Sequence, residues 1–154
     1  FFFFFFYLHS QIFFFFFFTP PPPKKKKKKS YLRQGDVPSA VAAVRQAYNN
    51  GAMLTPVMFR AIFAHCEQHA LGAEAGDLLR SLPVYEVAID ETAVMHTARA
   101  YIRAGQVPEL CSLIKTLTAP LADIVPSAML KALPAEVSSA EQRAHLAATL
   151  APHT

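Results

Sequence analysis

The sequence predicts an all-α protein, a right-handed α-solenoid of helix-turn-helix repeats with a period of 35 residues. Three observations lead to this fold class. Short segments separated by 35 or 70 positions resemble one another. Proline, glycine and helix-capping residues divide the chain into segments of helical length. No stretch of five or more residues alternates between apolar and polar side chains as a half-buried strand would.

Residues 1–30 are a low-complexity tail that we set aside from the fold. It holds two runs of six phenylalanines, a run of four prolines and a run of six lysines. One interpretation is a translated homopolymer tract. The alternative is a membrane anchor with a cytosolic body, because an 18-residue helix is about 27 Å long and basic flanks stay on the cytosolic side.

The remaining chain is not basic. Six of the 15 basic residues lie in the lysine run, whereas all 11 acidic residues lie beyond it, so the rest of the chain has a net charge of −2. This excludes a basic nucleic-acid module on charge grounds. Two cysteines, Cys66 and Cys111, are too few for a disulfide scaffold or a four-cysteine zinc site, and we expect both in the core.

A repeat is visible within residues 31–154. Five residues near position 35 recur 70 positions later, and half that distance reveals a divergent middle copy in which Gly35, Ala70 and Gly105 align as small residues. The recurring residues are Tyr31, Arg33, Gly35, Val37 and Pro38, which return as Tyr101, Arg103, Gly105, Val107 and Pro108. The repeats are expected at about 31–55, 56–90, 91–125 and 126–150.

The first two predicted helices have clear ends. Asp36 and Pro38 open a helix that runs to about residue 48 and stops at Asn50-Gly51. Thr55 and Pro56 then provide an N-cap and a first-turn proline for a helix that extends to about residue 69.

Five further helices follow from similar signals. One spans about residues 73–82 and ends at Pro83. Asp90 caps the next, which extends to residue 104 with Gly105 in the left-handed position after it. A helix opens at Pro108, and a last pair covers 126–133 and 140–150, with Ser138 and Glu141 as a capping box.

The chain resembles the pentatricopeptide-repeat family. Members typically have an aromatic residue, a basic residue and a glycine before the turn inside the hairpin, as Tyr101, Arg103 and Gly105 do here, and they end a repeat with Asn or Asp, as at Asp90. The resemblance covers about residues 31–125. The middle copy departs from it, with Ala70 for glycine and Cys66 for the aromatic residue. A tetratricopeptide repeat is one residue shorter and has a Trp and Leu-Gly opening that is absent here. A generic α-solenoid stays open.

The resemblance implies a groove in which two side chains per repeat read one base of single-stranded RNA. The family register pairs Arg60 with Asp90 and Met95 with Val125, and it leaves Leu130 without a partner. Met95 and Val125 offer no hydrogen-bond pattern to a base. Arg60 is equally able to form an ion pair with a nearby carboxylate. Arg99 and Arg103, four residues apart, are candidates for phosphate contacts.

No catalytic motif is present, so we expect no enzyme and no cofactor. His65 and His69 are four residues apart, but we expect ordinary surface histidines and no metal site. The leading hypothesis is a mitochondrial single-stranded RNA-binding or ribonucleoprotein scaffold subunit. The alternatives are a protein-protein interaction solenoid without RNA binding and a version tethered to a membrane by the phenylalanine tract. The chain is also compatible with a fragment of a longer repeat array.

Overall fold

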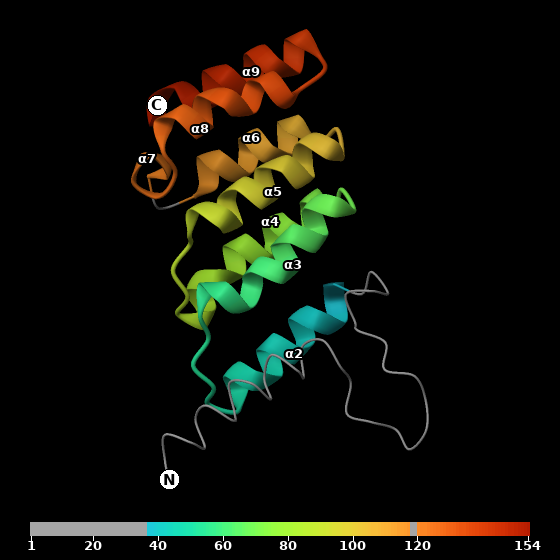
Figure 1. Ribbon diagram of the computed structural model, residues 1–154, viewed down its shortest axis with the longest axis vertical. Helices are drawn as coiled ribbons and strands as arrows, with labels where there is room; N and C mark the ends of the chain where they lie inside the picture. The colour runs from blue at the N-terminus through green and yellow to red at the C-terminus, as the bar shows by residue number, and fades with distance from the viewer. Residues whose placement is uncertain (1–36, 118–119) are drawn as a thin grey trace. The chain divides into compact units, whose positions relative to one another are not determined.

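The computed structural model describes residues 37–117 and 120–154 (Figure 1). Every regular element in those two ranges is a helix, so the all-α prediction is confirmed for them. The chain divides into an N-terminal unit, Phe1–Met53, and a C-terminal unit, Leu54–Thr154. The elements in chain order are α2 (Val37–Asn49), α3 (Pro56–Gln68), α4 (Gly72–Ser81), the 3-10 helix η2 (Leu82–Tyr85), α5 (Glu91–Arg103), α6 (Val107–Thr116), α7 (Leu121–Ile124), α8 (Ser127–Ala132), the 3-10 helix η3 (Leu133–Glu136), α9 (Ala140–Leu150) and the 3-10 helix η4 (Ala151–His153).

In the N-terminal unit the described part is a single long helix, α2, and the turn that ends it. As predicted, the helix stops at Asn50-Gly51, where Gly51 has a φ of 83°. The amide of Ala52 donates to the carbonyl of Ala47 at 3.0 Å. A hydrogen bond across five residues is typical of a helix that ends at a residue in the left-handed conformation. The expected tail at 1–30, the helix-opening Asp36 and the motif residues Tyr31, Arg33 and Gly35 lie outside the described residues.

The C-terminal unit begins with two helical hairpins, α3 with α4 and α5 with α6. Pro56 is the first residue of α3, as predicted, although the side chain of Thr55 makes no capping hydrogen bond. Asp90 does cap α5, since its Oδ1 accepts a hydrogen bond from the amide of Ala93 at 2.8 Å.

The turns inside these two hairpins have the same hydrogen bonds. Leu71 donates to the carbonyl of Cys66 at 2.8 Å in the first, and Gln106 donates to that of Tyr101 at 2.9 Å in the second. Gly105 has a φ of 71°, as predicted for a residue that follows a helix. Ala70 has a φ of 54° at the matching position, although its Cβ makes that conformation unfavourable.

Helix α5 is the centre of the C-terminal unit. It packs against α3 and α4 on one side and against α6 within its own hairpin (Figure 1). Its close approach to α4 depends on two glycines, because a Cβ on Gly72 would lie 2.7 Å from Cδ1 of Tyr101 and a Cβ on Gly76 would meet the Tyr101 hydroxyl. Phe59 of α3 and Tyr85 of η2 stack with ring centroids 6.2 Å apart.

The last pair of helices lies close to the predicted bounds, and α9 spans Ala140–Leu150 as expected. The expected helix over 126–133 is observed as α8, one residue shorter at each end, and the chain continues as the 3-10 helix η3. The capping box of Ser138 and Glu141 is wrong, because the N-cap of α9 is Ser139, whose side chain makes no capping bond. Helix α9 packs mainly on α6, and η3 packs on α5. The short helix α7 was not predicted.

A shared Leu-x-x-Leu-Pro segment explains where α4 and α8 end. It occurs at residues 79–83 and again at 130–134, and in both places the α-helix changes to a 3-10 helix at the second leucine. Leu82 and Leu133 have nearly identical backbone angles, φ −54° with ψ −44° and φ −54° with ψ −43°. The proline that follows cannot donate to the i−4 carbonyl, so the α-helical ladder stops at this point in both copies.

None of the helices in the described part of the chain is both long and apolar enough to cross a bilayer.

Candidate ligand face of α3 and α5

The predicted reader pair Arg60 and Asp90 does come together in the structure. Nη2 of Arg60 lies 3.4 Å from Oδ2 of Asp90, which is also the residue that caps α5. The Arg60 side chain is about half exposed, whereas that of Asp90 is one-quarter exposed. The arrangement is therefore an ion pair that links the start of α5 to α3, with the outer part of the guanidinium open to solvent.

Arg103 is paired with a carboxylate that lies deeper. Its Nη2 is 3.0 Å from Oε1 of Glu67, and its Nη1 donates to the backbone carbonyl of Glu67 at 3.3 Å. Nδ1 of His96 contacts the other oxygen of the same carboxylate. Glu67 is only 12% exposed, so the last turn of α3 holds a nearly buried anion between two partners from α5.

Arg99 contacts η3 and not α3. Its Nε lies 3.2 Å from Oε1 of Glu136 in η3, so Arg99 and Arg103 reach in different directions although they are four residues apart. Each of the three arginines predicted to contact RNA thus has an acidic partner: Asp90 for Arg60, Glu67 for Arg103 and Glu136 for Arg99. Their charges are largely compensated within the chain.

The apolar reader positions lie in the core. Met95 is 5% exposed, Val125 is 1% exposed and Leu130 is fully buried. In this structure none of these side chains is open to a base. Met95 is buried because α5, which carries it, packs against α3, α4, α6 and η3.

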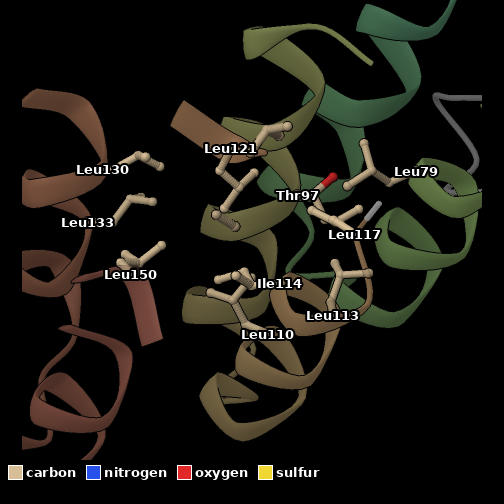
Figure 2. Close-up of a pocket in the computed structure, with 12 residues that line it drawn as sticks. Leu79, Thr97, Leu110, Leu113, Ile114, Leu117, Leu121, Leu130, Leu133 and Leu150 are labelled. Atoms are coloured by element: carbon tan, nitrogen blue, oxygen red, sulfur yellow. The ribbon is translucent and has the colours of Figure 1, made fainter. Parts of the chain in front are cut away.

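The cavity in Figure 2 is a packing gap between the second hairpin and the last pair of helices. Leu130, Leu133 and Leu150 face Leu110 and Ile114 across it, and Thr97 is the one polar residue in its lining. The volume is about 10 Å³ and the Thr97 hydroxyl already donates to the carbonyl of Ala93 at 2.7 Å. A space of that size with apolar walls holds at most one poorly bonded water, so it is not a ligand site.

The histidine pair at the end of α3 differs from the expectation of surface histidines. The rings of His65 and His69 have centroids 4.2 Å apart, but His65 is buried and its Nε2 has no partner. Burial, and secondarily the charge of His69, lowers the pKa of His65. The described residues contain no group of three or more His, Cys, Asp or Glu side chains suited to a metal ion.

The two cysteines are core residues, as predicted. Cys66 and Cys111 are free thiols with at most 1% exposure. Burial raises the pKa of the Cys66 thiol to about 11, with a smaller contribution from Glu74. The thiol therefore stays protonated at neutral pH.

Neither Glu67 nor His96 was predicted as a site residue from the sequence, although both take part in the polar contacts between α3 and α5. Glu67 is the penultimate residue of α3, and His96 and Arg103 lie 29 and 36 positions later, near the expected repeat length of 35. Opposite charges at roughly this separation are the signal that points to such pairs, because α3 and α5 pack against each other.

No protein-family model, curated protein or solved structure matches the chain.

Proposed function

We propose that the C-terminal unit is a protein-binding module built from repeated helical hairpins, in the manner of a short α-solenoid with a period of 35 residues. The observation that carries this proposal is the pairing of Arg60, Arg99 and Arg103 with acidic side chains of the same chain. A surface whose arginines are compensated internally has little free positive charge for a phosphate backbone.

The repeat architecture has support in the helix bounds. Helices α3 and α5 are both 13 residues long and begin at Pro56 and Glu91, and α4 and α6 are both ten residues long and begin at Gly72 and Val107. Each pair of starting points is 35 residues apart. The matching turn hydrogen bonds at Leu71 and Gln106 add to this regularity. It agrees with a pentatricopeptide-like repeat in the first two hairpins, whereas the last pair follows a different spacing.

The composition of the unit also favours a protein partner. Residues 54–154 hold seven basic and ten acidic residues. Two large apolar side chains of this unit are strongly exposed, Val57 at 54% and Val84 at 68%. Apolar side chains of this kind gain free energy when a protein partner covers them, whereas a phosphate backbone offers them no favourable contact.

Affinity purification of the full chain from its native cells, with and without nuclease treatment, tests the proposal. We expect a stoichiometric protein partner that survives nuclease digestion and that is lost when Val57 or Val84 is changed to Asp. The exposed Ala73→Asp variant is the matched control, which should keep the partner. Loss of every co-purifying protein after nuclease treatment would contradict the proposal.

RNA association is the second candidate, and one observation favours it. Arg60 and Asp90, which the family register assigns to one base, are in contact, and Arg60 keeps about half of its side chain exposed. An arginine in that position can exchange its carboxylate partner for a phosphate or a base edge. In this candidate function the protein is a ribonucleoprotein scaffold subunit in a mitochondrion. A membrane-tethered version of the protein would require the phenylalanine tract at 1–18 to act as an anchor.

Ultraviolet crosslinking followed by peptide mapping tests this second candidate. If it holds, RNA adducts map to the peptides that carry Arg60 and Asp90, and Arg60→Gln removes them. Adducts confined to the lysine run at 24–29 would contradict it. Mitochondrial import, followed by cell fractionation, tests the location, and release by carbonate extraction would argue against an integral anchor.

A further inference from the structure

The turn that ends α2 contains the one asparagine-glycine pair of the chain, Asn50-Gly51. Both residues are exposed, and neither belongs to the face of α3 and α5 described above. A Cβ added at Gly51 would meet nothing within 4 Å. The glycine is therefore required by its φ of 83° and not by close packing.

An asparagine followed by glycine has an intrinsic reactivity. The backbone nitrogen of the following residue, after losing its proton, is able to attack the side-chain Cγ of the asparagine. A new C–N bond forms and the bond from Cγ to the side-chain nitrogen breaks. That nitrogen takes up a proton in place of the one lost by the backbone nitrogen and leaves as ammonia, so that a five-membered succinimide results. Water then opens the ring at either carbonyl and yields aspartate or isoaspartate. Glycine favours the first step because it has no Cβ to hinder the approach.

We propose that Asn50 is a site of spontaneous deamidation whose rate is controlled by opening of the last turn of α2. The nitrogen that must attack is the amide of Gly51, and in the folded helix this amide donates to the carbonyl of Tyr48 at 2.9 Å. The amide of Asn50 is also held, by the carbonyl of Gln46 at 3.0 Å. The reaction therefore requires that these hydrogen bonds break first.

Opening of this turn is within ordinary reach of a helix end. Terminal turns open with small free energies compared with global unfolding. The hydrogen bonds that must break each contribute little net stability, so the native chain should react roughly tenfold more slowly than the unfolded chain. The turn thus slows the reaction and does not abolish it.

The product would weaken the turn that formed it. A new negative charge at position 50 lies at the C-terminal end of α2, where the backbone carbonyls already carry partial negative charge. Isoaspartate also inserts a methylene group into the main chain before Gly51. That insertion displaces the amides of Gly51 and Ala52 from the carbonyls of Tyr48 and Ala47, to which they donate at 2.9 and 3.0 Å. Deamidation and opening of the last turn of α2 therefore reinforce each other.

The experiment is a time course of the full chain at neutral pH, with and without urea, followed by tryptic digestion. Cleavage after Arg45 and Arg60 releases one peptide, 46–60, that contains both Asn49 and Asn50. Asn49 is the internal control, because Asn50 and not glycine follows it. We expect acid products at position 50 to accumulate well ahead of any at position 49. The conversion of Asn50 should be roughly tenfold slower in buffer than in urea.

Gly51→Ala is the variant that separates the chemistry from the fold. In urea, where no helix protects either sequence, Gly51→Ala should reduce conversion of Asn50 to the level of Asn49. Conversion of Asn50 no faster than Asn49 in the native chain would overturn the proposal. Equal deamidation rates of Asn50 in buffer and in urea would show that the last turn of α2 does not control the rate, which would overturn that part of the proposal.

Discussion

The aromatic ring of Tyr101 lies directly against Gly76, so close that a Cβ on Gly76 would meet the tyrosine hydroxyl. Glycine in the interior of a helix normally costs about 1 kcal/mol relative to alanine. Gly76 is nevertheless one of the two glycines that let α4 and α5 approach each other. Burial raises the pKa of the Tyr101 phenol, as expected for a hydroxyl held in this contact, and the nearby charges of Arg80, Asp77, Glu109 and Glu74 modify it further.

Gly76→Ala should destabilise the protein despite the better helix propensity of alanine. We expect a loss of about 1–3 kcal/mol in the free energy of unfolding, because the added methyl group overpacks the contact. Tyr101→Phe removes the clashing hydroxyl but leaves ring atoms at 3.0 and 3.1 Å from the Cβ, so only part of the loss should disappear in the double variant. Urea denaturation of the four proteins of this cycle measures the coupling.

Gly72→Ala is the control for that cycle. Its Cβ would lie 2.7 Å from Cδ1 and 2.9 Å from the Cα of Tyr101, so the clash is with atoms that Tyr101→Phe retains. Rescue of Gly72→Ala by Tyr101→Phe would show that the packing of α4 on α5 differs from this description.

Ala70→Gly should stabilise the protein. Ala70 has a φ of 54°, which a residue with a Cβ adopts at a cost of about 1–2 kcal/mol. Glycine removes this cost but gains chain entropy in the unfolded state, so a net gain of about 0.5 kcal/mol is expected. Thermal and urea denaturation measure it.

The reciprocal change tests the same equivalence at the next turn. Gly105 has a φ of 71° and open space around its Cβ position, so Gly105→Ala should cost about 1 kcal/mol through backbone strain alone. A stabilising Gly105→Ala, or a destabilising Ala70→Gly, would mean that the two turns are not equivalent.

Glu67→Gln should destabilise the protein more than loss of a surface ion pair does. Its carboxylate is 12% exposed and contacts both His96 and Arg103, so neutralising it weakens two charge-assisted contacts and should cost about 1–2 kcal/mol. Asp77→Asn removes the carboxylate that pairs with Arg80 at 3.0 Å on the exposed side of α4, and it should change stability by less than about 0.5 kcal/mol. Equal effects of the two variants would argue against a structural role for Glu67.

The stability of the protein should fall on mild acidification because of His65. Burial lowers the pKa of this histidine below its ordinary value of 6.5, so the folded chain binds fewer protons than the unfolded chain. Its contribution is complete above pH 6.5 and is lost as the pH falls from there towards the lowered native pKa. His65→Leu should flatten this dependence between about pH 7 and 5, as measured by denaturation at each pH.

His145 provides the comparison for this experiment, because it is exposed on α9. His145→Leu should leave the pH dependence of the wild-type chain in place. A His65→Leu protein that still loses stability like the wild type over the same range would remove His65 as the cause.

The sequence predicted most helix ends because they depend on local backbone chemistry. The proline at position 56, the carboxylate of Asp90 and the glycines at 51 and 105 act within one turn, so their effect is readable without knowledge of the fold. The Leu-x-x-Leu-Pro segment likewise ends α4 and α8, each one residue before the predicted positions 82 and 133.

The contacts of Arg60, Arg99 and Arg103 were harder to predict, because their partners are distant in sequence. The resemblance placed Arg60 beside Asp90, and the two are in contact. It also placed Met95 and Val125 at a base, but both are buried, since burial depends on how neighbouring helices pack. The burial of His65 has the same origin.

The most direct test of the central claim, that the arginines of α3 and α5 are compensated within the chain, is the salt dependence of single-stranded RNA binding. Fluorescence anisotropy should be compared for the full chain, for a variant with the six lysines at 24–29 changed to Gln, and for Arg60→Gln combined with Arg99→Gln. We expect the full chain to bind with a salt slope no steeper than about −4, from six lysines. The six-Gln variant should lose that binding, and the arginine double variant should keep it. RNA binding that persists without the lysine run and disappears with the two arginines would contradict the account.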